Sequence, residues 1–149
     1  AFIDAICMWA VRNPEWYDVV LTPNMFGDIS TDLASVLQGG MGIAASANLG
    51  DKHGMFEPVH GSAPKYAGQN TTNPMAMISS VSMMFDWLGD TKDDADCRAV
   101  GDFIDRAVAE VLKGDTLTYD LGGSAGTTDV GDAVVAQLEK MLREHFAVA

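Results

Sequence analysis

One stretch of the sequence gathers residue types that could hold a phosphate-bearing ligand. Met55–Pro74 reads MFEPVHGSAPKYAGQNTTNP, and its prolines and glycines rule out a continuous helix or a central strand. Around His60–Ala63 the glycine lets backbone N–H groups come close to a phosphate, while Lys65 adds a positive charge and Tyr66 adds a hydroxyl. We therefore predict a long ordered loop that binds such a ligand; the alternative is a surface loop without a site.

A second candidate site is a pair of carboxylates spaced for a metal ion. Asp28 and Asp32 are four residues apart within a helical pattern, so their side chains share one helix face. Two carboxylates this close repel each other, and a hard divalent cation with oxygen ligands would relieve the repulsion. The spacing leaves two other interpretations open: a solvated acidic face, and Asp28 as the N-cap of the helix.

The elements expected to position these residues are mainly helices, because apolar residues recur at helical spacing. Helices are expected at Asp4–Arg12, Gly27–Leu37, Met75–Leu88, Ala95–Leu112 and Asp129–His145. Asn73 and Pro74 are expected to start the third of these, with proline in its first position. Short strands are expected at Asp18–Thr22 and in the alternating part of Gly114–Thr128, before a loop. Strands this few cannot close a sheet by themselves, so the predicted fold class is α/β with further strands supplied from elsewhere.

Composition and charge narrow the class of protein. The chain has 149 residues, 48% hydrophobic and 20% charged, which is typical of a globular domain with its own core. A formal net charge of −12 argues against a nucleic-acid partner, and neither a membrane-spanning run nor a secretory signal is visible. Cys7 and Cys97 lack zinc-site spacing, so we expect free thiols and a cytoplasmic location. The helical pattern at Ala1, without a Met, predicts a piece of a longer protein.

Two motifs resemble one family of enzymes. HGSAPKYAGQN and the following NP are similar to the adenosine-binding loop of the isocitrate/3-isopropylmalate dehydrogenase family, the metal-dependent decarboxylating dehydrogenases. Residues 24–32, NMFGDISTD, resemble a second motif of that family, in the right order. The resemblance covers nearly the whole chain and implies the C-terminal portion of that α/β fold. Residues 1–44 would belong to the smaller domain, which forms the dimer interface and binds metal, and residues 45–149 to the larger, cofactor-binding domain.

The resemblance also implies a metal site shared between two subunits. In the family, the residues matching Asp28 and Asp32 hold Mg²⁺ or Mn²⁺ together with a third aspartate from an earlier helix. Asp4 matches that third ligand through the run IDAICMWAVRNPEWYDVV. One of the three comes from the neighbouring subunit, so a homodimer is expected in which Asp4 serves the partner's site.

The cofactor implied by the resemblance is NADP, with NAD also possible. Lys65 stands where NAD-dependent members have an aspartate, and Tyr66 follows it. The string KYAGQ is similar to NADP-dependent isocitrate dehydrogenases, in which both residues contact the 2′-phosphate. Tyr119 matches a second tyrosine of those enzymes, but the arginine expected four residues later is Gly123 here. By the same matching, the predicted cofactor-binding residues are Glu57, His60, Gly61, Ser62, Ala63, Lys65, Tyr66, Asn73 and Tyr119. Among them, Asn73 matches the residue at the adenine edge.

The activity implied is oxidative decarboxylation of a malate-type 2-hydroxy acid. The motif FEPVHGS resembles isopropylmalate and tartrate/D-malate enzymes, whereas KYAGQ resembles isocitrate enzymes. Either 3-isopropylmalate or isocitrate is therefore expected as substrate, with tartrate or D-malate also open. The family's catalytic Tyr and Lys lie upstream of Ala1, so we expect this chain alone to bind cofactor and metal weakly and to turn nothing over. The alternative is a non-catalytic partner subunit that keeps the fold and the interface.

Overall fold

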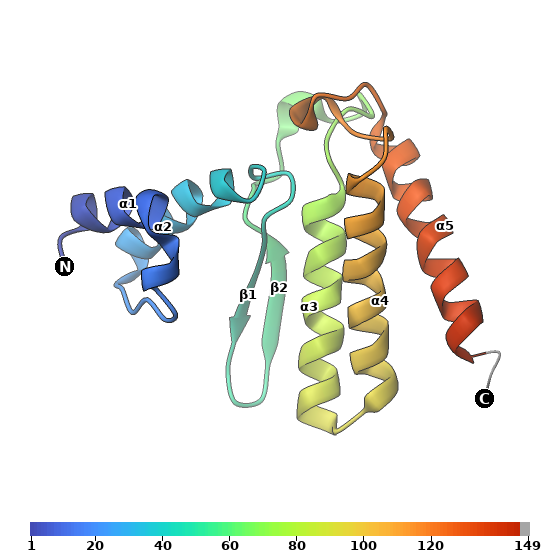
Figure 1. Cartoon of the computed structure of the whole chain (residues 1–149), viewed down its shortest axis with the longest axis horizontal. Coiled ribbons are helices and arrows are strands. Elements are labelled where there is room, and N and C mark those ends of the chain that lie inside the picture. Colours follow the sequence, from blue (N-terminus) through green and yellow to red (C-terminus); the bar gives the residue numbers. More distant parts are fainter. Residues whose placement is uncertain (147–149) are drawn as a thin grey trace.

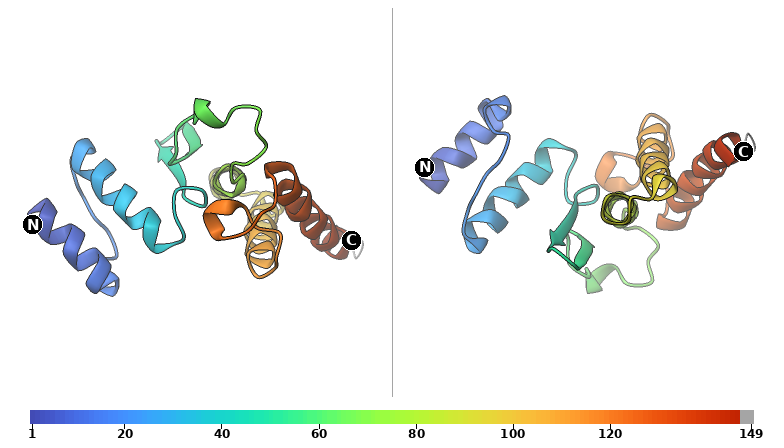
Figure 2. Two further views of the ribbon diagram at one scale, coloured as in Figure 1. Left: turned by 90° about the horizontal axis from the view of Figure 1, so that it is seen from above. Right: turned by 90° about the horizontal axis from the view of Figure 1, so that it is seen from below.

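The computed structural model describes residues 1–146 of the chain. The described elements are α1 (Ile3–Arg12), η1 (Pro14–Trp16), α2 (Asn24–Leu37), β1 (Ala45–Leu49), β2 (Gly54–Pro58), η2 (Pro64–Tyr66), α3 (Met75–Lys92), α4 (Ala95–Leu112), η3 (Tyr119–Leu121) and α5 (Thr127–Phe146). The helices and strands follow one another across the molecule, except that the segment after α4 folds back towards the loop after the strands before it reaches α5 (Figure 1). Figure 2 shows α1 and α2 on one side of the strands and α3, α4 and α5 on the other. Residues 147–149, the end of the predicted cofactor domain, lie outside the described residues.

The hydrophobic core lies among α3, α4 and α5. Apolar residues at helical spacing on α4 meet the first turn of α3 and one face of α5. The buried side chains of this cluster are Met75, Ala107, Val108, Val111, Val130 and Val134. No described helix is apolar over a length that would cross a bilayer.

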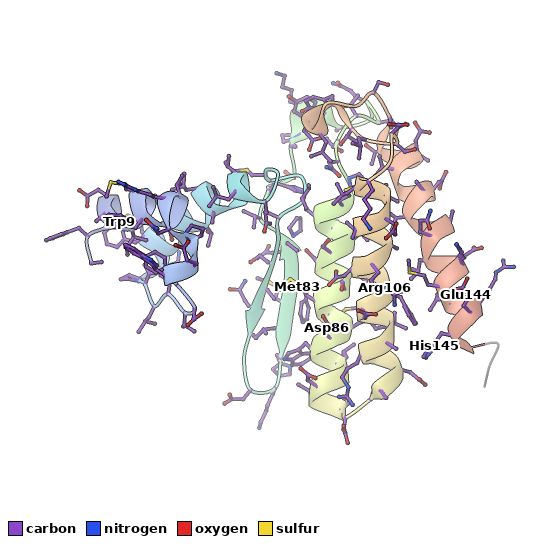
Figure 3. The ribbon with its side chains drawn as sticks, in the orientation of Figure 1. Trp9, Met83, Asp86, Arg106, Glu144 and His145 are labelled. Carbon is purple, nitrogen blue, oxygen red and sulfur yellow. The ribbon has the colours of Figure 1, made fainter. Side chains whose placement is uncertain are left out.

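A capping residue fixes the start of α4, and small residues set the distance between α3 and α4. Asp94 accepts the backbone N–H groups of Asp96 and Cys97 at 2.9 and 3.0 Å, so it is the N-cap of α4. Farther along, Ser82 Oγ donates to the carbonyl of Gly101 at 2.9 Å. A Cβ on Gly101 would clash with the carboxylate of Asp86, which lies between the two helices (Figure 3). The helices therefore approach closely along this line.

The two strands form an antiparallel hairpin that lies against α3. The register pairs Ala45 with Pro58 and Leu49 with Gly54. Phe56 of β2 contacts Trp87 of α3, with ring centroids 6.0 Å apart. The hairpin thereby delivers the end of β2, and the loop that follows it, to the N-terminal end of α3.

The two strands predicted from the sequence, at Asp18–Thr22 and within Gly114–Thr128, were wrong. Residues 18–22 form no strand, and Val19 and Leu21 are 89% and 98% exposed. A β-branched run needs a neighbouring strand for its backbone hydrogen bonds, and no described segment supplies one. Around Tyr119 the chain forms η3 instead of a strand, because the Thr118 carbonyl accepts both Leu121 N–H at 3.1 Å and Gly123 N–H at 3.0 Å and so closes a turn.

The predicted helices were confirmed, with shifted ends. α2 begins at Asn24, three residues before the predicted start, so Asp28 lies inside the helix and the N-cap interpretation is wrong. Pro74 occupies the N-cap of α3 and not its first helical position, with φ −87° and ψ −6°. The predicted long loop starts after Pro58, because the residues before it belong to β2.

Candidate functional site

A pocket of about 910 Å³ lies where the hairpin, the loop after β2 and η3 meet. Its walls come from the turn Gly39–Gly42, from the end of β2 and the loop, from Met77 on α3, and from Tyr119 and Asp120. The end of β2 contributes Glu57 and Pro58, and the loop contributes His60, Gly61, Ser62, Ala63, Tyr66, Thr72 and Asn73. The structure therefore brings together all the predicted cofactor-binding residues except Lys65.

The loop enters this pocket through a backbone conformation that is rare for alanine. Ala63 has φ 45° and ψ 55°, in the left-handed region, and such residues cluster at functional sites. From there the chain turns into η2, where Tyr66 N–H donates to the Ala63 carbonyl at 2.9 Å. The turn places Tyr66 in the pocket wall and leaves Lys65 exposed beside it, its Nζ 5.5 Å from the centroid of the Tyr66 ring.

Tyr66 and Tyr119 meet at the pocket, although they come from distant parts of the sequence. Their ring centroids are 6.5 Å apart and the ring planes differ by 35°. A hydrogen bond between the two side chains raises the pKa of Tyr119 above its ordinary value, and the neighbouring Asp120 carboxylate acts in the same direction. Two hydroxyls and one ammonium group thus gather at the same edge of the pocket.

Asn73 has a structural role as well as a place in the pocket. It is only 8% exposed. Its Oδ1 accepts the N–H of Met75 at 2.9 Å, and its Nδ2 donates to Asp120 Oδ2 at 3.1 Å. The side-chain amide is therefore occupied at both ends by contacts within the protein. The sequence analysis gave Asp120, the residue after Tyr119, no role.

Asn70 is a second residue that sequence reasoning missed. It has φ 54°, and its Oδ1 accepts both the N–H of Thr128 at 3.0 Å and the Thr128 hydroxyl at 2.8 Å. Its carbonyl accepts the N–H of Thr127 at 3.0 Å. Asn70 thus caps α5 from the loop and ties the two together. The usable signal was asparagine itself, which tolerates φ > 0 and is a favoured capping residue.

The charge of the pocket is carried by a few side chains. Glu57 and Asp120 contribute carboxylates to its walls, and the described residues that line it include no Lys or Arg. His60 Nδ1 lies 2.7 Å from the Gly61 carbonyl. Because a carbonyl only accepts, Nδ1 carries a proton and a neutral ring presents Nε2 as an acceptor. The cation next to the pocket is Lys65, so an anionic ligand would be drawn to that edge.

The predicted metal ligands are exposed and do not meet within one chain. Asp4 lies on α1, and Asp28 and Asp32 lie on α2. Within residues 1–146 no group of three or more His, Cys, Asp or Glu is placed to hold a metal ion. Asp28 Oδ2 accepts a hydrogen bond from Asn24 Nδ2 at 3.0 Å. The prediction that a second subunit completes the ligand set stays a prediction.

Comparisons with known proteins agree with this architecture. The sequence profile of the isocitrate/isopropylmalate dehydrogenase family matches residues 1–134, and the chain belongs to that family. It is 46% identical over 143 residues to a homoisocitrate dehydrogenase of Methanocaldococcus jannaschii, covering 96% of this chain and 39% of the relative. It is 43% identical to a 3-isopropylmalate dehydrogenase of Novosphingobium aromaticivorans, covering 92% of this chain and 39% of the relative.

A solved structure gives the same result for the fold. An isocitrate dehydrogenase from Methylococcus capsulatus matches with a TM-score of 0.82 and 40% identity, over 93% of this chain and 40% of that one. The predicted family and the predicted fold, as a portion of the larger one, are confirmed. The chain spans about two fifths of the length of the relatives it matches.

Proposed function

We propose that the chain is the cofactor-binding portion of an NAD(P)-dependent, Mg²⁺- or Mn²⁺-dependent decarboxylating dehydrogenase. The observation that carries the proposal is the pocket in which η2, η3 and the loop after β2 gather Tyr66, Tyr119 and Asn73. The proposed substrate class is a malate-type 2-hydroxy acid. The names of the relatives, homoisocitrate and 3-isopropylmalate dehydrogenase, support this class and leave its particular member open.

The nucleotide proposed for the pocket is NADP, with NAD as a weaker ligand. Lys65 and the hydroxyls of Tyr66 and Tyr119 would hold the 2′-phosphate, since a compact cation and hydroxyl donors suit a phosphate. No arginine supplements them at position 123. A Cβ there would clash with the carbonyl of Leu117, so the backbone of Leu117, which precedes η3, excludes any side chain at Gly123. NADP recognition would therefore rest on Lys65 and the tyrosine pair.

The metal site is proposed to form between two copies of the chain. Carboxylate oxygens suit Mg²⁺ and Mn²⁺, so Asp28 and Asp32 of one subunit would hold the ion together with Asp4 of the partner subunit. When bound, the ion would supply Lewis-acid stabilisation of the negative charge that develops on the substrate oxygen. Support for a homodimer comes from the apolar side chains that α1 and α2 expose, including Met8, Val11, Ile29 and Val36. The two free cysteines support a cytoplasmic location.

The test is a calorimetric titration of the chain with NADP⁺ and with NAD⁺, in buffer containing Mg²⁺. We expect NADP⁺ to bind tighter by about tenfold, which corresponds to about 1.4 kcal/mol. Equal affinities, or tighter NAD⁺ binding, would contradict the role given to Lys65 and the tyrosine pair. Binding of neither nucleotide would favour the alternative of a non-catalytic partner subunit.

A further inference from the structure

Asp120 connects three segments that form the wall of the pocket. Its Oδ2 accepts a hydrogen bond from Asn73 Nδ2 at 3.1 Å, and its Oδ1 accepts one from the Thr118 hydroxyl. A Cβ on Gly42 would clash with the Asp120 carboxylate and lie 2.9 Å from Asn73 Cβ, so only glycine lets the turn before β1 approach this pair. One carboxylate thus fixes the end of the loop against both η3 and the glycine turn.

The contacts of Asn73 separate its side chain from its backbone. The side-chain amide is engaged by Asp120 and by the N–H of Met75. The backbone N–H and carbonyl of Asn73 form no hydrogen bond with any of the described residues. Buried backbone groups are nearly always paired, and Asn73 is 8% exposed and lines the pocket. These two backbone groups are therefore the ones that Asn73 can offer to a ligand.

A backbone N–H and a carbonyl on one residue match the edge of an adenine, where the N1 acceptor lies beside the 6-amino donor. We propose that Asp120 is a positioning residue: by holding the Asn73 side chain, it presents this backbone pair to the adenine edge without contacting the base itself. The inference rests on the proposed nucleotide-binding function. This role explains why the Asn73 side-chain amide binds other groups of the protein although Asn73 lines the pocket.

The chemistry of Asp120 suggests which replacement should preserve the role. Thr118 is fully buried, and its hydroxyl can donate or accept. In Asp120→Asn, the new carbonyl can accept from Asn73 while the new amide donates to Thr118, so both contacts survive. In Asp120→Ala, both contacts are lost, and the Asn73 side chain is held only by Met75.

The experiment measures base discrimination by the chain and its variants. Calorimetry gives the Kd of NADP⁺ and of its hypoxanthine analogue, in which N1 is a donor and the 6-position an acceptor, so the backbone pair is mismatched. For the unmodified chain we expect the analogue to bind about tenfold more weakly or worse. In Asp120→Ala this ratio should fall towards one, and in Asp120→Asn it should stay within about threefold of the original value. Asp115→Ala, which removes an exposed carboxylate from the same segment, is the matched control and should leave the ratio unchanged.

Each other outcome overturns the inference in a distinguishable way. If Asp120→Ala weakens both dinucleotides equally and keeps the ratio, Asp120 only supports the fold. If the unmodified chain binds NADP⁺ without discriminating between the bases, the role of Asp120 fails while the proposed function stands. If it binds neither dinucleotide, the proposed function fails and the inference with it.

Discussion

The two ends of the molecule are both helical, yet they are packed in different ways. α3, α4 and α5 enclose a core whose central side chains, Met75 and Val130, are fully buried. In α1 no residue is buried, and in α2 the one buried residue is Ser35. Trp9 marks this end of the molecule in Figure 3. Its ring packs against that of Trp16, with the centroids 5.1 Å apart and the ring planes tilted by 30°. An amphipathic pattern therefore decides that a helix forms, but only the neighbouring elements decide whether its apolar face is buried.

The same difference applies to the two candidate sites. The pocket at the tyrosine pair is built from segments of one chain, which α3, α4 and α5 hold in place. The carboxylates Asp4, Asp28 and Asp32 lie on the helices that have no core of their own. We therefore expect nucleotide affinity to be independent of protein concentration, and affinity for Mn²⁺ to rise as the chain associates.

The largest expected effect comes from a pair of truncations that compare the two ends. Met75→Ala removes a fully buried side chain and should lower the free energy of unfolding by about 2–5 kcal/mol. Leu21→Ala removes a side chain that is 98% exposed and should change it by less than about 0.5 kcal/mol. Urea denaturation followed by circular dichroism measures both. Equal losses at low protein concentration would show that the contrast between the ends is wrong.

A pair of glycine substitutions tests the same contrast along the helix backbones. Gly101→Ala on α4 places a Cβ against the Asp86 carboxylate between two packed helices, and should cost about 1–3 kcal/mol. Gly27→Ala on α2 places its Cβ 3.3 Å from Thr22 Cγ2, the end of a side chain in a segment that forms no sheet, so we expect little change. Thermal unfolding of the two variants is the measurement. A gain in stability for Gly101→Ala would mean that α3 and α4 are not held at this distance.

The nucleotide site offers a smaller effect, on selectivity. Lys65→Asp places a carboxylate beside the tyrosine pair, where it would repel a 2′-phosphate and accept hydrogen bonds from ribose hydroxyls. The ratio of the Kd values for NAD⁺ and NADP⁺ should shift towards NAD⁺ by about tenfold or more. Lys52→Asp, in the turn of the β1–β2 hairpin, makes the same charge change away from the pocket and should leave the ratio unchanged. An unchanged ratio in Lys65→Asp would refute the cofactor assignment.

The smallest effect is a dependence of stability on pH at the α3–α4 contact. Burial raises the pKa of Asp86, and so do the carboxylates of Asp105, Asp90 and Asp102. The folded chain therefore holds this proton to higher pH than the unfolded chain. The stabilisation is present at acidic pH and is lost as the pH rises through the raised pKa. Asp86→Asn should flatten that part of a plot of melting temperature against pH and slightly raise stability at neutral pH. A steeper plot would contradict this sign.

The sequence predicted the helices well because each carries its own repeating pattern. Strands were harder to predict, because a strand forms only where another strand pairs with it. The end of β2 is fixed by its pairing with β1, and a strand at 18–22 would need a neighbour. The residues around Tyr119 close a turn through Thr118 instead. Most of the pocket was found because the motifs that resemble the family run through the loop and η3. Asp120 and Asn70 were missed because their contacts join residues 47 and 58 positions apart, which no local pattern records.

Because Asn70 of the loop caps α5, the stability of the first turn of α5 reports whether the loop is ordered. The same loop forms the pocket wall and closes the first turn of this helix, so each can open only when the other does. A ligand that binds only the ordered loop stabilises the ordered state by its binding free energy. Local unfolding of the first turn of α5 must then cost the same additional free energy. Amide hydrogen exchange at Thr127 and Thr128 should therefore slow when the pocket is filled, although neither residue lines that pocket.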